Sequence, residues 1–121
     1  MNKLLTEMNK SGNFNFSVLT DRQGLPIAYA TAPGYDPDRQ SASVAQVQKA
    51  VGQVGQQLGM AQTDEIVLND ANGQRLVCRL FSVNGHDLVL AITVPHRDQS
   101  FRRATSRAIS EIRRIWEYYW E

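Results

Sequence analysis

The stretch DPDRQSASVAQVQKAVGQVGQQLG (residues 36–59) predicts one long amphipathic helix at the centre of the chain. Asp36 is a favourable N-cap residue, and Pro37 suits the first helical turn because its missing N–H needs no partner there. Gly59 suits the position just past the helix, where a left-handed conformation is common. An apolar stripe at three- and four-residue steps indicates a face turned toward a core: Val44, Val47, Val51, Val54 and Leu58.

A second stripe on the same helix consists of small residues: Ser41, Ala45, Gly52, Gly55 and Gly59. A glycine inside a helix costs roughly 0.5–1 kcal/mol relative to alanine, so two interior glycines call for a compensating contact. Close approach of another backbone would supply that contact. The backbone belongs either to the sheet of the same chain or to the same helix in a second protomer, and the pattern leaves both interpretations open.

Composition indicates a soluble cytoplasmic protein with one domain over residues 1–121. Thirteen Lys and Arg against 12 Asp and Glu give a net charge of +1, so the whole molecule has no electrostatic attraction to nucleic acid or to anionic membranes. The single cysteine, Cys78, excludes an internal disulfide and fits a reducing compartment. No apolar run approaches the roughly 20 residues that cross a bilayer, and residues 1–11 do not read as a secretory signal.

The segments around the central helix predict two further helices and five strands. Pro26 places the second strand at an edge of the sheet, because proline cannot donate to ladders on both sides. We expect helices at 1–11 and from about Ser100 to the end, and strands at 14–20, 25–30, 63–70, 74–82 and 87–94.

The last three strands carry two strong hairpin signals, Asn72-Gly73 and Asn84-Gly85. If both are two-residue turns, the opposed pairs are Asp70 with Arg75, Leu68 with Val77, and Phe81 with Leu88. This register places on one face Ile66, Leu68, Val77, Phe81, Leu88, Leu90 and Ile92. It places on the other face Val67, Leu76, Cys78, Leu80, Val89 and Ala91.

Because both faces of this sheet are apolar, helices must cover both of them. The sequence therefore predicts an α+β fold with three layers, helix–sheet–helix. Its five-stranded antiparallel sheet has the element order α-β-β-α-β-β-β-α.

The order and spacing of four segments resemble the Roadblock family, named for the dynein light chain and common as stand-alone domains in prokaryotes. These segments are FSVLTDRQGLPIAYA (16–30), QLG (57–59), DEIVLND (64–70) and LVLAITV (88–94), and the resemblance covers nearly the whole chain. It implies a profilin-like domain that dimerises with a second copy or with a related Roadblock chain. It also implies that the dimer serves as a platform for a small Ras-like GTPase and modulates that protein's nucleotide cycle or location.

In the family, the central helix pairs with its copy and the following strand pairs edge to edge, elements that correspond to 41–59 and 63–70 here. The residues that this resemblance and the small stripe assign to the dimer interface are Ser41, Ala45, Gln48, Gly52, Gly55, Gln56, Gly59, Asp64, Glu65, Val67 and Asn69.

We find no pattern that predicts catalysis, a cofactor or a metal, and therefore expect no enzyme activity. The stretch GQVGQQLG (52–59) lacks the Lys-Ser/Thr ending of a phosphate-binding loop. His86 and His96 lack the cysteine partners of a structural zinc site. Cys78 lies within a predicted strand at a core position and is expected to be an inert thiol.

The last helix is basic and ends in the aromatic run RRIWEYYWE (113–121). A solvated outer face is one interpretation of its arginines, and a contact patch for another protein or a phospholipid is the other. The candidate patch residues are Arg102, Arg103, Arg107, Tyr118 and Trp120.

Our leading functional hypothesis is a non-enzymatic homodimeric regulator or scaffold for a small Ras-like GTPase. Two alternatives belong to other classes. One is a sensor domain of similar layered fold with a small ligand between the sheet and the central helix. The other is a peripheral binder of membrane or nucleic acid that uses the arginines of the last helix.

Overall fold

A computed structural model describes the backbone of residues 1–120 and the side chains of residues 1–118. The element order is α-β-β-α-β-β-β-α, as predicted. In chain order the elements are α1 (Asn2–Gly12), β1 (Phe16–Asp21), β2 (Pro26–Thr31), α2 (Pro37–Gln57), β3 (Glu65–Asn69), β4 (Arg75–Val83), β5 (His86–Val94) and α3 (Arg102–Trp120).

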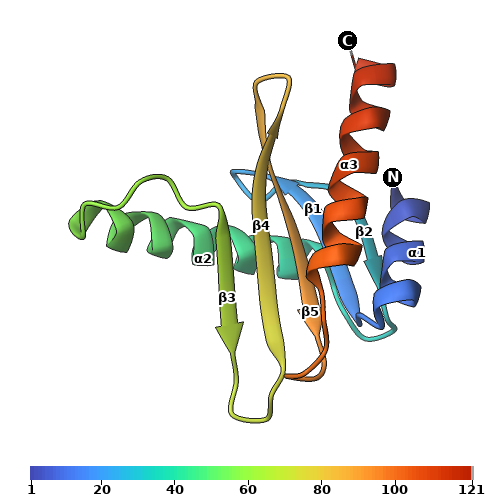
Figure 1. Ribbon diagram of the computed structural model, residues 1–121, viewed down its shortest axis with the longest axis horizontal. Coiled ribbons are helices and arrows are strands. Elements are labelled where there is room, and N and C mark those ends of the chain that lie inside the picture. Colours follow the sequence, from blue (N-terminus) through green and yellow to red (C-terminus); the bar gives the residue numbers. More distant parts are fainter. Residues whose placement is uncertain (121) are drawn as a thin grey trace.

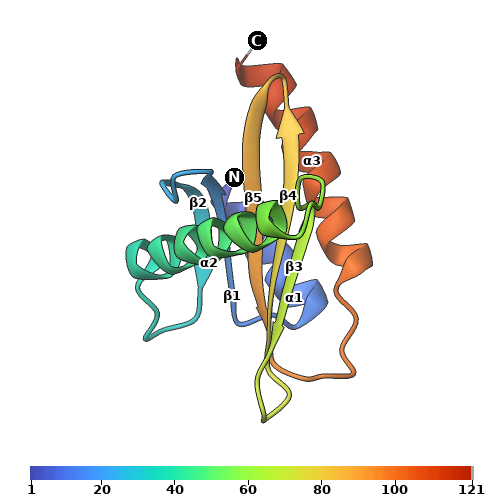
Figure 2. The same ribbon diagram turned by 90° about the vertical axis from the view of Figure 1, so that its left-hand side faces the viewer.

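The five strands form one antiparallel sheet in the order β2-β1-β5-β4-β3. Helix α2 crosses one face of the sheet, whereas α1 and α3 cover the other (Figures 1 and 2). The predicted three-layer fold is therefore confirmed. Strand β2, which begins with Pro26, lies at an edge of the sheet, as the proline predicts.

Two hydrophobic clusters hold the layers together, one on each face of the sheet. Under α2, Val44 packs with Phe16 and Val18 of β1, and all three side chains are at most 2% exposed. On the opposite face, Leu5 of α1 and Ile112 of α3 pack against the sheet. Each helix is thus fixed by burial of its apolar stripe, the term that contributes most to helix stability in proteins.

Both predicted ends of α2 are confirmed. Asp36 caps the helix, because its Oδ1 accepts a hydrogen bond from the N–H of Asp38 at 3.1 Å. Pro37 is the first helical residue. Gly59 has a φ of 69°, the left-handed conformation that ends many helices.

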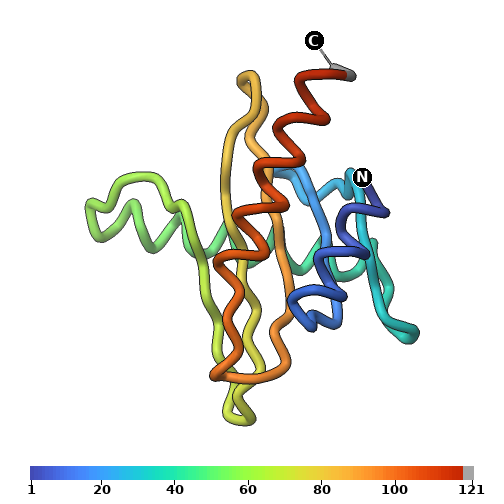
Figure 3. The backbone as a smooth tube through the Cα atoms, turned by 45° about the vertical axis from the view of Figure 1, so that its right-hand side comes forward, coloured from blue at the N-terminus to red at the C-terminus, as the bar shows by residue number. Residues whose placement is uncertain are grey.

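The apolar stripe of α2 leaves the core near its C-terminal end. Val47 and Val51 pack against the sheet, but Val54 is 53% exposed and Leu58 is 70% exposed. The prediction that these last two residues face the core of the same chain is therefore wrong. The reason is geometric: α2 runs across the strands and continues past the edge of the sheet at β3 (Figures 1 and 3).

The predicted register between β3 and β4 is wrong by one residue. The structure opposes Leu68 with Leu76, Val67 with Val77, and Asn69 with Arg75. The loop has three residues instead of two, because the N–H of Asp70 donates to the carbonyl of Gln74 at 2.9 Å and Gly73 takes a φ of 87°. This is a common longer form of the hairpin loop, in which a glycine in the left-handed conformation follows the turn.

The side chain of Asp70 consequently makes no cross-strand pair with Arg75. Its Oδ1 accepts hydrogen bonds from the N–H groups of Asn72 and Gln74, at 2.9 and 2.8 Å. The second turn does have two residues, Asn84-Gly85, and the predicted pair of Phe81 with Leu88 is confirmed.

The one-residue shift moves every β3 side chain to the other face of the sheet. Ile66 shares the α2 face with Cys78 and Ala91, and Leu68 is on that face as well. Val67 lies on the opposite face, beside Val77. The predicted faces are wrong for these three β3 residues and correct for the residues of β4 and β5.

Candidate functional site

Strand β3 has an open outer edge. Two hydrogen bonds, from Leu80 N to Asp64 O at 2.9 Å and from Asp70 N to Gln74 O, turn the main chain of even-numbered β3 residues toward β4. The main-chain groups of the odd-numbered residues Glu65, Val67 and Asn69 therefore face outward. No other strand in the described part of the chain pairs with them. An edge of this kind is a template for pairing with another chain.

Exposed apolar side chains gather beside this edge. They come from the part of α2 that passes β3, from the following loop, and from the α2 face of β3: Val54, Leu58, Met60 and Leu68, which are 48–70% exposed. An exposed apolar group next to an unpaired strand edge is typical of a protein–protein interface.

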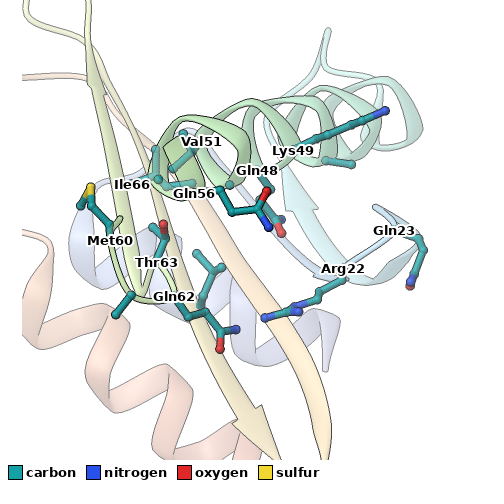
Figure 4. A pocket seen from close by; sticks show the side chains of 15 residues that line it. Arg22, Gln23, Gln48, Lys49, Val51, Gln56, Met60, Gln62, Thr63 and Ile66 are labelled. Carbon is teal, nitrogen blue, oxygen red and sulfur yellow. The ribbon is translucent and has the colours of Figure 1, made fainter. Parts of the chain in front are cut away.

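A groove of about 670 Å³ lies between α2, the loop after it and the sheet. Figure 4 shows its lining. Gln48 and Gln56 come from α2, Gln62 and Thr63 come from the loop, and Ile66 comes from the sheet below.

The small-residue stripe of α2 is divided between two environments. At its N-terminal end the turn of the β1–β2 hairpin approaches closely, so a Cβ on Gly24 would lie 2.6 Å from that of Ala45 and 3.1 Å from the carbonyl oxygen of Ser41. At its C-terminal end Gly52 and Gly55 line the groove. Apart from its own helix, a Cβ on Gly52 would meet no described atom within 4 Å.

The first interpretation, contact with the sheet of the same chain, therefore applies only to the N-terminal half of the stripe. Contacts within the chain explain Ser41 and Ala45. They do not explain Gly52, whose helix surface faces open space.

The sequence matches no family model and no curated protein. The structure, in contrast, does match solved structures. MglB from Myxococcus xanthus superposes with a TM-score of 0.79 at 21% identity, over 97% of this chain and 94% of that one. A Roadblock/LC7 domain from Streptomyces avermitilis gives 0.74 at 13% identity, over 98% and 96%. This chain has the Roadblock/LC7 fold. The gliding protein MglB from Thermus thermophilus has it too, with a TM-score of 0.73 at 20% identity over 96% and 87%.

The Roadblock fold brings most of the predicted interface residues into one region. Those that line the groove are Ala45, Gln48, Gly52, Gly55 and Gln56, and those whose main chain faces outward on β3 are Glu65, Val67 and Asn69. Gly59 follows the end of α2.

Several predicted interface residues are engaged within the chain. Ala45 lies against the turn at Gly24, and the side chain of Glu65 pairs with Arg102. Ser41 is fully buried, and its hydroxyl donates to the carbonyl of Pro37 at 2.7 Å. The carbonyl of Asp64 accepts from Leu80, so its main chain faces β4.

Sequence reasoning missed the exposed apolar residues of this region: Val54, Leu58, Met60 and Leu68. The stripe on α2 contained the first two, but the periodicity of a helix does not reveal where the sheet beneath it ends.

The arginines of the predicted patch on α3 lie on two sides of the helix. Arg102 faces β3 and forms an ion pair with Glu65 at 2.9 Å. Arg107 lines a groove between α1 and α3 together with Glu7 and Glu111. Arg103 is exposed, Tyr118 is 81% exposed, and the side chain of Trp120 lies outside the described residues. Arg102 and Arg107 therefore lie in different surroundings, one beside β3 and the other beside α1.

The remaining His, Cys, Asp and Glu side chains of the described residues do not gather into a candidate metal site. No group of three or more His, Cys, Asp or Glu side chains there could hold a metal ion. The ring of His86 packs against Trp116 at 5.5 Å. No helix in residues 1–120 combines the length and the apolar content that a bilayer crossing needs.

Cys78 should be almost unreactive in the folded protein. The side chain is fully buried, and burial raises the pKa of its thiol from 9.0 to about 12. At pH 8 we expect iodoacetamide to alkylate the folded protein about a thousandfold more slowly than the urea-unfolded chain, because the thiolate is the nucleophile. Mass spectrometry of timed samples measures both rates, and comparable rates would contradict the buried placement.

The same pKa shift predicts a loss of stability at alkaline pH. The unfolded chain loses the thiol proton near pH 9, and the folded chain keeps it until about pH 12. The folded state therefore binds more protons between these values, and the free energy of unfolding falls by up to about 1.4 kcal/mol per pH unit. In the Cys78→Ala variant, the part of this fall in the free energy of unfolding that comes from the thiol should be absent.

Proposed function

We propose that this protein is a non-enzymatic regulator or scaffold that dimerises through α2 and β3 and binds a small Ras-like GTPase. In this proposal the dimer modulates the nucleotide cycle or the location of the GTPase. The fold shared with MglB and with the Roadblock/LC7 domain supports the proposal. The observation that carries it is the open edge of β3 beside exposed apolar side chains and a glycine-lined groove.

These features fit a two-fold symmetric contact, in which one surface meets a copy of itself. The outward main-chain groups of β3 would pair with those of a second β3 and extend the sheet across two chains. Because α2 continues past β3, the same arrangement would bring it over the sheet of the partner, where Val54 and Leu58 would be buried. The groove beside Gly52 and Gly55 would receive the partner's α2.

A proline substitution tests the strand contact. Val67→Pro removes an outward-facing N–H from the middle of β3, and edge strands tolerate proline at such positions. Two hydrogen bonds are lost per symmetric dimer, at about 0.5–1.5 kcal/mol each, so the dissociation constant should rise roughly five- to 150-fold. Light scattering after gel filtration measures the mass against the chain mass of 13.6 kDa.

Val67→Thr is the matched control, because threonine keeps the N–H and the β-branched shape of valine. It should dimerise like the natural protein. If Val67→Pro also dimerises with unchanged affinity, strand pairing through β3 is not the contact.

Binding of the GTPase is tested with a purified small Ras-like GTPase from the same organism. It is loaded with GDP or with a non-hydrolysable GTP analogue and titrated with the dimer in a calorimeter. We expect binding that depends on the nucleotide, and a changed rate of GTP hydrolysis or exchange for a regulator. Binding without a change in rate indicates a scaffold, and absence of binding in both nucleotide states counts against the proposal.

A further inference from the structure

Strand β4 is longer than its neighbour β3. Strand β3 begins at Glu65, which opposes Arg79, and the last link between the two strands is the hydrogen bond from Leu80 N to Asp64 O. From there to Val83 the outer edge of β4 has no neighbouring strand among the described residues, and the β4–β5 hairpin extends past the start of β3 (Figure 1).

The register shows which main-chain groups this free edge presents. The two-residue turn Asn84-Gly85 is closed by Val83 and His86, so odd-numbered residues in this part of β4 bond to β5. The even-numbered Ser82 therefore turns its N–H and C=O outward, and Leu80 turns its C=O outward. None of these three groups has a hydrogen-bond partner in the described part of the chain.

Hollows border this edge on both sides. Toward α3 lies a groove of about 370 Å³, lined by Arg79, Phe81 and Arg113 among others. A smaller hollow of about 210 Å³ lies along Leu80 and Ser82. Leu80 also borders the large groove under α2. A strand laid beside β4 would direct alternate side chains toward α3 and toward α2.

The α3 side of the edge carries two guanidinium groups that have no carboxylate partner in the described part of the chain, Arg79 and Arg113. Asp64 and Glu65 line the same groove, but Glu65 pairs with Arg102, which leaves a net positive charge there. Arg79 donates to the hydroxyls of Thr105 and Ser106, at 3.0 and 2.7 Å, and Arg113 lies over the ring of Phe81 at 5.7 Å. Neither has a carboxylate within 4.0 Å among the described residues, whereas the neighbouring Arg102 is paired. A segment with acidic side chains on this side would find complementary charge, because arginine favours carboxylates geometrically as well as electrostatically.

We propose that the β4 edge from Leu80 to Val83 binds an extended segment of a partner protein by strand addition. The acidic side chains of the segment face Arg79 and Arg113, and its uncharged side chains face α2. Main-chain hydrogen bonds supply the affinity, and the alternation of the two sides supplies the specificity. The edge belongs to one chain, so this binding does not depend on dimerisation.

The probe for this site is a fluorescein-labelled peptide with three Glu-Val repeats and blocked ends. Fluorescence polarisation measures its dissociation constant, and amide NMR spectra locate it on the protein. We expect shifts concentrated at Leu80–Val83 and on the adjacent residues of α3. A Lys-Val peptide of the same length should bind at least about tenfold more weakly, because like charges then meet.

Two pairs of variants separate main-chain pairing from charge. Ser82→Pro removes the outward N–H and should weaken peptide binding roughly tenfold, whereas Ser82→Ala keeps that N–H and should bind normally. Arg113→Glu should weaken binding by about the same factor. Its control is Arg114→Glu, since Arg114 already pairs with Glu111 and does not line the groove.

Several results would overturn the proposal. These are equal binding of the acidic and basic peptides, equal binding by Ser82→Pro and Ser82→Ala, or shifts confined to other surfaces. A lower dimer fraction in Ser82→Pro would identify a second copy of this chain as the occupant, which also contradicts it. The experiments on β3 and on the GTPase measure dimerisation and GTPase binding, whereas the peptide experiments measure binding at the β4 edge. The proposed function and the proposal for β4 can therefore fail independently.

Discussion

Replacing Gly52 with leucine should weaken dimerisation at least roughly 30-fold and leave the folded chain intact. Apart from its own helix, nothing described in the chain lies within 4 Å of a Cβ at this position, so a side chain here starts in open space in the isolated protomer. Leucine also has a higher helix propensity than glycine, by somewhat under 1 kcal/mol. The protomer should therefore unfold at the same temperature as the natural chain or at a higher one.

In the proposed dimer the same side chain would separate two helices that approach through their glycines. Overpacking of this kind costs about 1–3 kcal/mol, and two-fold symmetry applies the cost twice. The dissociation constant should rise by a factor between roughly 30 and 10⁴. Sedimentation equilibrium over a range of concentrations measures the change.

The control for this variant is Gln53→Leu, which places the same side chain one residue further along α2. Gln53 is exposed and does not line the groove beside Gly52. The Gln53→Leu variant should have a dissociation constant within about threefold of that of the natural protein, as expected for a surface substitution that removes no contact. Equal dimerisation of Gly52→Leu and the natural protein would show that the groove is not where α2 meets a partner.

Truncating Phe16 to alanine should lower the free energy of unfolding by about 3–5 kcal/mol, a large part of the total for a domain of this size. Phe16 is fully buried, packs in the cluster with Val44 of α2, and stacks on Tyr35 with ring centroids 5.9 Å apart. The substitution leaves a cavity between β1 and α2 that the surrounding side chains can fill only in part.

Urea unfolding followed by circular dichroism measures this effect. The experiment belongs in the Gly52→Leu background, because dimerisation adds stability that depends on protein concentration. Leu25→Ala is the control. Leu25 is 65% exposed, and its truncation should change the unfolding free energy by no more than about 0.5 kcal/mol. A loss below 1 kcal/mol for Phe16→Ala would mean that α2 does not rest on β1 as described.

Local chemistry in the sequence was sufficient for the element order and for several boundaries. Asp36 and Pro37 begin α2 through one cap hydrogen bond and one fixed φ, and neither depends on distant residues. Pro26 likewise predicts an edge strand from local chemistry alone, because proline has no N–H to donate to a neighbouring strand. The Asn84-Gly85 turn fixed the register of β4 and β5 correctly.

The β3–β4 register shows where local signals were insufficient. Asn72-Gly73 fits both a two-residue turn and the last two positions of a three-residue loop, and both keep apolar pairs across the strands. In the structure the loop has three residues, and the side chain of Asp70 accepts hydrogen bonds from two N–H groups of this loop. That difference of one residue decides which face Val67 and Leu68 occupy.

The sequence by itself determined the layered fold, because apolar periods of two and of 3.6 residues, with caps and turn residues, depend only on neighbours along the chain. Only the tertiary structure decided where α2 leaves the sheet and that Gly52 borders an open groove. It also decided that Arg79 of β4 lies near Arg113 of α3 beside a free strand edge. These features depend on the lengths and crossing angles of elements distant in sequence, and the apolar periodicity of the sequence does not predict either quantity.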